Sequence, residues 1–242
     1  MKISIVLCTL IIALVSIEPA MAMPGGKIAG AFFDSPWTKI LLGIVYIILF
    51  PFIIYVHVVE KCAVRRTKKD LRAMTQYSDI FEWLKIREHV KKCFYSVHSG
   101  WSDENLSKAS NFMTDWYWKN QQIACLDRWK REGLVNICNV KMISNMKPLL
   151  FMHTNDDIEH EGSYIAISIT ARMQDYLKNI KTEKIIEGSK RYKDVDSIWI
   201  FTLIDNEWKV SDIEDGSLSL SYARLFQELK PVEATIANSN RS

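Results

Sequence analysis

The sequence lacks the short motifs that mark the common nucleotide, metal and hydrolase sites. None of GxxxxGKS/T, GxGxxG, HExxH or GxSxG occurs in it, and phosphate loops, zinc helices and nucleophile elbows need those spacings. Its five cysteines include no CxxC pair, so we expect reduced thiols rather than a disulfide framework. We therefore predict a protein with no catalytic residues, no metal and no cofactor.

A strong overall charge is also missing. The net charge is only +3, whereas nucleic-acid-binding domains usually carry a marked basic excess. No internal repeat or low-complexity segment is present. We expect no nucleic-acid partner.

The chain begins with a short apolar run behind a basic start. ISIVLCTLIIALVSI follows Met1-Lys2, and Ala20-Met21-Ala22 supplies small residues for cleavage before Met23. This order is typical of a secretory signal peptide over residues 1–22. The alternative is that this run stays as an uncleaved membrane helix. A short extracytoplasmic segment, residues 23–39, follows in either case.

A second apolar run, residues 40–59, has 20 residues without a formal charge. At about 1.5 Å per residue, a helix of this length crosses a hydrocarbon core of about 30 Å. Pro51 lies inside it, and neighbouring groups can accommodate a proline in a membrane helix. We predict one transmembrane helix here.

Basic residues cluster directly after that run. Six occur within residues 61–72, and such clusters mark the cytoplasmic end of a span. They also attract anionic headgroups, although a topology signal alone would explain them. The predicted patch for topology and anionic lipid is Lys61, Arg65, Arg66, Lys68, Lys69 and Arg72. Whether or not the signal is cleaved, residues 60–242 are placed in the cytoplasm of a bacterial-type cell, anchored to its inner membrane.

The remaining chain has helical periodicity first and strand periodicity later. A basic juxtamembrane helix over residues 60–78 precedes three helical stretches, and residues 134–151 and 164–173 then alternate as strands. A hairpin with an Asp205-Asn206 turn follows. The intervening residues 175–195 are charged, and we predict a loop with a short element around Ile185-Ile186.

Residues 218–229 are expected to form a short helix, with a flexible tail over 230–242. Three helices on about four antiparallel strands make an α+β domain with a bent sheet.

Two stretches carry a family resemblance. IFEWLKIREHVKKCFYSVHSGWSDENLSKASNFMTDWYW, residues 80–118, and the hairpin SIWIFTLIDNEWKVSDIED resemble the C-terminal domain of the mitochondrial import-motor anchor subunit, Tim forty-four, and its bacterial relatives. The resemblance covers roughly residues 79–215 of a domain placed at 79–229. It implies a cone like nuclear transport factor two, whose bent sheet encloses a pocket. The fold-signature aromatics, which are also candidate pocket-lining residues, are Trp101, Trp116, Trp199, Phe201 and Trp208.

Two polar groups are candidates for chemistry. His153 and His160 lie in an acidic stretch with Asp156, Asp157, Glu159 and Glu161, which we interpret as a solvated turn rather than a metal or acid–base site. A pocket base would need a carboxyl group with a pKa raised by burial. The apolar-flanked candidates are Asp115 and Asp175, and we interpret both as surface carboxylates.

The functional hypothesis is a non-enzymatic membrane adaptor or scaffold that binds a protein partner or lipid, linked by the resemblance to protein translocation or complex assembly. One alternative is an inner-membrane subunit of a secretion complex, whose domain lies outside the cytoplasm. Another is a pocket enzyme or small-molecule carrier. The location of the domain discriminates the first two hypotheses.

Overall fold

The computed structural model describes residues 36–154, 160–225, 228, 229 and 232. The chain divides into two compact units, Met1–Val59 and Glu60–Ser242. The predicted signal peptide lies outside the described residues, as do most of the segment 23–39 and nearly all of the predicted tail.

In the first unit, every described residue belongs to α3 (Pro36–Met74), a 39-residue helix whose last part belongs to the second unit. Large apolar side chains are exposed along it, from Trp37 to Val58. Within the described part of the chain, α3 is the one helix long and apolar enough to cross a membrane. This finding is consistent with single-pass anchoring.

The helical half of the second unit follows the three predicted stretches, and the first of them contains one long regular α-helix, α4. Its elements are η1 (Asp79–Phe81), α4 (Trp83–Ser102), the 3-10 helix η2 (Leu106–Phe112), α5 (Asp115–Gln121), the π-helix η3 (Gln122–Asp127) and α6 (Arg128–Arg131). Side-chain caps begin three of them, and Ser78 accepts a hydrogen bond from the backbone of Ile80 at the start of η1. Asn105 accepts a hydrogen bond from the backbone of Ser107, and Thr114 accepts one from that of Tyr117.

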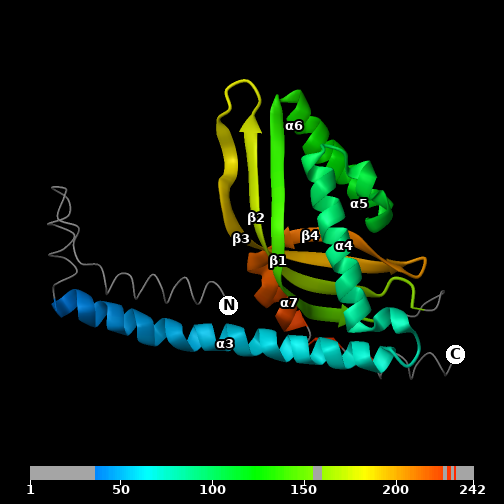
Figure 1. The fold of residues 1–242 in the computed structure, drawn as a ribbon. Coiled ribbons are helices and arrows are strands. Elements are labelled where there is room, and N and C mark those ends of the chain that lie inside the picture. Colours follow the sequence, from blue (N-terminus) through cyan, green and yellow to red (C-terminus); the bar gives the residue numbers. More distant parts are fainter. Residues whose placement is uncertain (1–35, 155–159, 226–227, 230–231, 233–242) are drawn as a thin grey trace. The chain divides into compact units, whose positions relative to one another are not determined.

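Four strands form one antiparallel sheet in the order β1-β2-β3-β4 (Figure 1). Their bounds are β1 (Leu134–Met152), β2 (Tyr164–Asn179), β3 (Ile185–Ile204) and β4 (Glu207–Asp215). The turn of the β3–β4 hairpin is at Asp205 and Asn206, with φ of 52° and 60°. A type I′ turn requires such left-handed values, so the predicted hairpin is confirmed.

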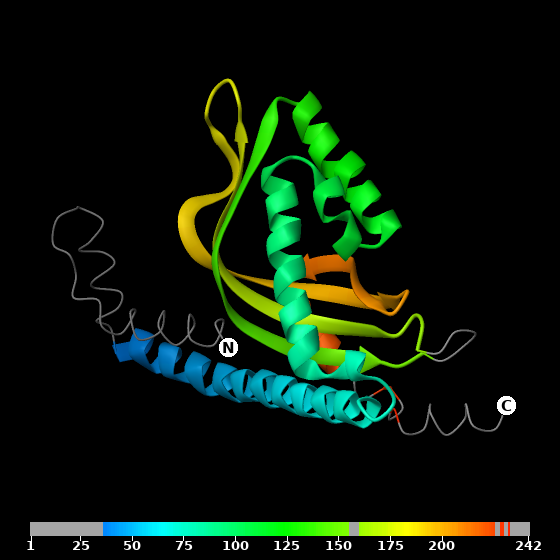
Figure 2. The same ribbon diagram turned by 45° about the vertical axis from the view of Figure 1, so that its right-hand side comes forward.

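The sheet is strongly bent, as Figure 2 shows for β1 and β2. Three register shifts interrupt their pairing, after Val140, Ile143 and Pro148. Bulges of this kind bend a strand and increase its twist. Beyond the bend, β1, β2 and residues 185–195 of β3 form a three-stranded arm that β4 does not reach.

The predicted loop over residues 175–195 is confined to residues 180–184, and the short element predicted around Ile185-Ile186 is the start of a long strand. β2 continues to Asn179 and β3 begins at Ile185, with Tyr176 paired to Gly188 and Leu177 to Glu187. Most side chains on this part of β3 are exposed on both faces of the sheet. Backbone hydrogen bonds to β2 therefore hold this part of β3. Its sequence has no alternation of apolar residues from which a strand could be predicted.

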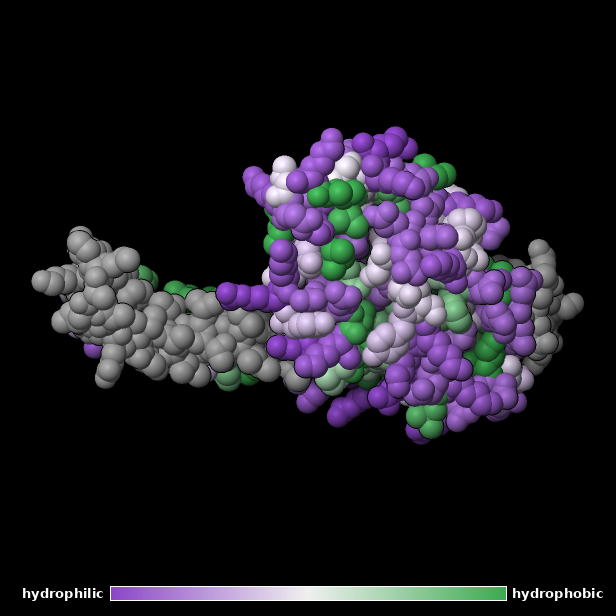
Figure 3. Space-filling view, turned by 45° about the horizontal axis from the view of Figure 1, so that its top comes forward, coloured by the Kyte–Doolittle hydropathy of each residue, from purple (hydrophilic) through white to green (hydrophobic). Residues whose placement is uncertain are grey.

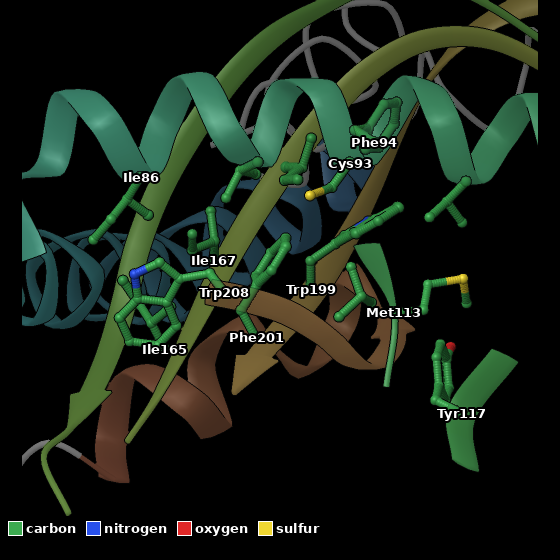
Figure 4. Close-up of a cluster of buried hydrophobic side chains, with 14 of the residues drawn as sticks. Ile86, Cys93, Phe94, Met113, Tyr117, Ile165, Ile167, Trp199, Phe201 and Trp208 are labelled. Atoms are coloured by element: carbon green, nitrogen blue, oxygen red, sulfur yellow. The ribbon is translucent and has the colours of Figure 1, made fainter. Parts of the chain in front are cut away.

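The main core lies between α4 and one face of the sheet (Figure 4). The predicted alternation of β2 is confirmed, because Ile165, Ile167, Ile169, Ala171 and Met173 are all buried. From β3, Trp199 adds a fully buried indole whose ring centroid is 4.9 Å from that of Phe94 on α4. Trp208 of β4 is also buried and donates its indole N–H to the Ile80 carbonyl at 3.1 Å.

The other face of the sheet carries a second cluster, formed by Leu149, Leu150, Ala166 and Ile198. Val64 of α3 and Tyr222 of α7 (Ser219–Leu225) pack against it. The short η4 (Gly216–Leu218) leads into α7, which confirms a terminal helix within residues 218–229. The domain is thus α+β, with helices packed on a four-stranded antiparallel sheet and one long apolar helix near the N-terminus.

Replacing Trp199 should destabilise the fold far more than replacing Trp116. Trp199→Ala removes a fully buried indole and should lower the free energy of unfolding by about 3–5 kcal/mol. Trp116 is 71% exposed, so Trp116→Ala should change it by less than about 0.5 kcal/mol. Chemical denaturation of the full chain in detergent micelles, followed by tryptophan fluorescence, measures both. Equal losses would contradict this assignment of the core.

Candidate functional site

The helical segment 60–74 of α3 has two opposite faces. One face is buried in the second unit and consists of Ala63, Thr67, Asp70, Leu71 and Met74. The other is exposed and basic, and we call it the basic stripe: Lys61, Arg65, Lys68, Lys69 and Arg72. At about 100° per residue, the stripe occupies an arc of about 100° on the side away from the buried face.

Arg66, the sixth residue of the predicted patch, does not belong to the stripe. It is half-buried, and its Nε donates to Asp70 Oδ2 at 3.3 Å. Its Nη2 donates to the Leu229 carbonyl at 3.4 Å. Arg66 therefore ties the helix to the C-terminal part of the chain, and the structure divides the predicted patch into five exposed cations and one internal contact.

A buried carboxylate fixes the start of this segment. The side chain of Glu60 is only 8% exposed and accepts hydrogen bonds from Lys147 Nζ at 3.0 Å and from Ser219 Oγ at 2.9 Å. These partners lie on β1 and α7. A buried carboxylate is tolerated only with such partners, so this cluster fastens the helix to the sheet and to α7. Sequence reasoning missed it, and the available signal was a lone Glu directly behind an uncharged run.

The structure separates the five predicted aromatics. Trp199, Phe201 and Trp208 are buried in the main core. Trp101 is half-buried at its edge, 5.8 Å between ring centroids from Trp129. Trp116, which we expected among the fold-signature aromatics, is exposed on α5.

The two candidate bases have different environments. Asp115 is exposed, and hydrogen bonds from Lys119 and from the Trp118 indole lower its pKa. That direction is opposite to what a general base working near neutral pH needs. Asp175 is half-buried on β2, and burial raises its pKa.

The histidines of the acidic stretch contact each other. His153 Nε2 and His160 Nδ1 are 3.0 Å apart, and burial lowers the pKa of His153. Glu161 accepts a hydrogen bond from the backbone N–H of Asp205 at 3.2 Å. The other three acidic residues lie outside the described residues. Across the described part of the chain, no three His, Cys, Asp or Glu side chains are grouped to hold a metal ion.

A second pair that sequence reasoning missed is Cys138 and His98. Cys138 Sγ is 3.1 Å from His98 Nδ1, although 40 residues separate them in the sequence. Burial raises the pKa of Cys138 to about 12 and lowers that of His98 to about 4. A nucleophilic cysteine needs thiolate character, so these groups are a neutral core contact at pH 7.

Comparison of the chain with protein-family models and with curated proteins gives no match. Among solved structures, the chain is similar to the crystal structure of the intermembrane space region of the chloroplast protein ARC6. The two share 8% sequence identity with a TM-score of 0.38, over 53% of this chain and 94% of the other. A likeness at this level carries no argument about fold or function.

Removing the cation beside Glu60 should destabilise the domain. Lys147→Met leaves the Glu60 carboxylate buried with Ser219 alone, and should lower the free energy of unfolding by about 1–3 kcal/mol. The double variant Glu60→Gln/Lys147→Met should recover part of that loss, because no buried charge remains. Chemical denaturation of the full chain in micelles measures each variant.

Lys119→Met is the matched control, since Lys119 pairs with the exposed Asp115. Its effect should stay within the small range of surface pairs. A double variant no more stable than Lys147→Met would contradict the role given to the buried charge.

Proposed function

We propose that the chain is a single-pass membrane adaptor without enzymatic activity, whose domain binds a protein partner at the cytoplasmic face of a bacterial-type inner membrane. We assign the domain to the cone-shaped fold of nuclear transport factor two, in the Tim forty-four-like family. The support is the resemblance of residues 80–118 and 197–215, together with the bent antiparallel sheet under α4 (Figure 2). By the same resemblance, the adaptor acts in protein translocation or in the assembly of a membrane complex.

The observation that carries the proposal is the division of the helical segment 60–74. Its buried face belongs to the core of the domain, while the basic stripe is exposed. The same helix, α3, carries the apolar run in the first unit and the segment 60–74 in the second. Basic residues directly behind a span favour the cytoplasmic side and contact anionic headgroups.

The exposed surface of the helical half supports a protein partner. Trp116 on α5 and Ile123 on η3 are 71% and 63% exposed. They are seven residues apart, about two turns of helix, and so share one side of it. Exposed aromatic residues of this kind are enriched at the energetic centres of protein interfaces.

A reporter fused behind Ser242 should show that the domain is cytoplasmic. We expect a green fluorescent protein fusion to be fluorescent and an alkaline phosphatase fusion to be inactive, because phosphatase needs the oxidising side of the membrane. The converse pair of results would overturn the proposal in favour of a secretion-complex subunit. The alternative of a pocket enzyme or carrier is tested separately. A ligand that stays bound to the purified chain, or a cellular phenotype that is lost in Asp175→Asn, would favour that alternative.

The basic stripe should give the protein a preference for anionic lipid. In nanodiscs, electron paramagnetic resonance of spin-labelled phosphatidylglycerol and phosphatidylcholine measures their relative association with the full chain. Each basic residue near a headgroup contributes about 1 kcal/mol, and even a sixth of that sum over four residues is a threefold change, so we expect the preference to fall by about threefold or more. The four changes are Lys61→Gln, Arg65→Gln, Lys68→Gln and Arg72→Gln.

A control with the same change in charge carries Arg87→Gln, Lys91→Gln, Lys92→Gln and Arg131→Gln, all at exposed positions. It should keep the preference of the unmodified chain. If both quadruple variants behaved alike, the stripe would have no special role in lipid contact.

A further inference from the structure

The part of β3 that lies in the arm has an open edge. β4 pairs only with Ser197–Ile204, whereas β2 pairs along β3 from Ile185 to Thr202. Residues 185–195 therefore have a neighbouring strand on one side only, and Figure 1 shows no described helix or strand along the other side. Unpaired backbone N–H and C=O groups on such an edge are a template for another strand.

A built bulge shapes this edge. Gln174 of β2 lies opposite three residues of β3, Lys190, Arg191 and Tyr192, and its Nε2 donates to the Lys190 carbonyl at 2.5 Å. Gly188 precedes the bulge with φ of +82°, and a Cβ at this position would lie 2.2 Å from the Asp175 carbonyl oxygen. Only glycine fits there, so the backbone geometry that leads into the bulge at Lys190, Arg191 and Tyr192 is fixed.

The edge carries an excess of positive charge. Within residues 185–195 it has Lys190, Arg191 and Lys193 against Glu187 and Asp194. Asp194 is already engaged by Arg172, at 3.8 Å. Among the described residues, Lys190, Arg191 and Lys193 have no salt-bridge partner within 4.0 Å, and all three side chains are exposed.

This charge discriminates between the strands that could pair here. Two copies of the chain, edge to edge, would bring like charges into opposition, which destabilises cross-strand pairs. Lysines on an edge block self-association in this way. The same charges attract a strand with carboxylate side chains, so repulsion and attraction both favour an acidic partner over a second copy.

We propose that residues 185–195 of β3 bind an extended acidic segment of a partner protein as an additional strand of the sheet. The backbone of β3 supplies the hydrogen bonds, and Lys190, Arg191 and Lys193 contact the carboxylates of the partner. Ile186 and Tyr192, 54% and 42% exposed, contact its apolar residues. This inference rests on the adaptor function proposed above and names the chemistry of the partner. Figure 3 shows the molecule with the top of Figure 1 turned forward. The face seen there is mainly hydrophilic, with hydrophobic residues in separate patches.

The test uses the full chain in nanodiscs of neutral lipid and three fluorescent synthetic peptides. The first alternates Glu and Val, the second alternates Lys and Val, and the third is the Glu–Val peptide with methylated amides along one edge. Fluorescence anisotropy should detect binding of the first peptide alone. Amide hydrogen exchange should slow within residues 185–196 when that peptide is bound.

The variant Lys190→Gln/Arg191→Gln/Lys193→Gln should bind the Glu–Val peptide at least about tenfold more weakly. Its matched control is Arg87→Gln/Lys91→Gln/Lys92→Gln, with the same loss of charge from exposed positions on α4, and this should bind as the unmodified chain does. Equal binding of the methylated peptide would show that charge alone acts and would overturn strand addition. Failure of the first peptide to bind would overturn the proposal outright.

These results are separable from those on the adaptor function. If the reporter fusions place the domain in the cytoplasm but the peptide does not bind, the adaptor function stands and strand addition at this edge is refuted. If the peptide binds but the domain lies outside the cytoplasm, strand addition at this edge stands and the proposed adaptor function is refuted.

Discussion

The burial of one face of the helical segment 60–74 is the constraint on which the rest of the structure depends. A strongly bent sheet has two faces to cover, and α4 covers only one of them. On the other face, Ala166 and Ile198 lie under Val64 and Tyr222. The helix that follows the apolar run is therefore a structural part of the domain rather than a linker, and its basic side chains must point away from the sheet. The buried Glu60, with partners on β1 and α7, holds this arrangement at the start of the segment.

Much of the fold follows from local rules in the sequence. The hairpin was predictable because Asp205-Asn206 tolerates the left-handed turn. The core face of β2 was predictable because one face of a half-buried strand repeats every second residue. The β3 strand of the arm was not predictable, since residues 185–195 are mostly exposed on both faces and carry no apolar period. Trp116 was misplaced for a related reason: residues 106–112 are a 3-10 helix, which advances by about 120° per residue, so an α-helical stripe loses its phase before α5.

For the candidate site, the sequence shows which basic residues are present but not which of them are exposed or what they contact. A cluster of basic residues behind an apolar run identifies the segment, while only the burial pattern shows which five are exposed and that Arg66 is internal. The contacts of Glu60 with Lys147 and Ser219 span 87 and 159 residues of sequence. The contact between Cys138 and His98 likewise joins residues that are 40 positions apart. Contacts of such separation arise from the topology of the sheet, and no local pattern encodes them.

The small net charge of the chain conceals an uneven distribution. Exposed basic residues form the stripe of α3 and lie along the open edge of β3. By contrast, Glu60 is buried with a cationic partner, and Cys138 and His98 are buried and neutral. Exposed charges act through solvent and are screened beyond about 8–10 Å at physiological salt. They therefore give association that is fast, reversible and sensitive to ionic strength. The adaptor function that we propose, in which a partner is held and released, uses contacts of that kind.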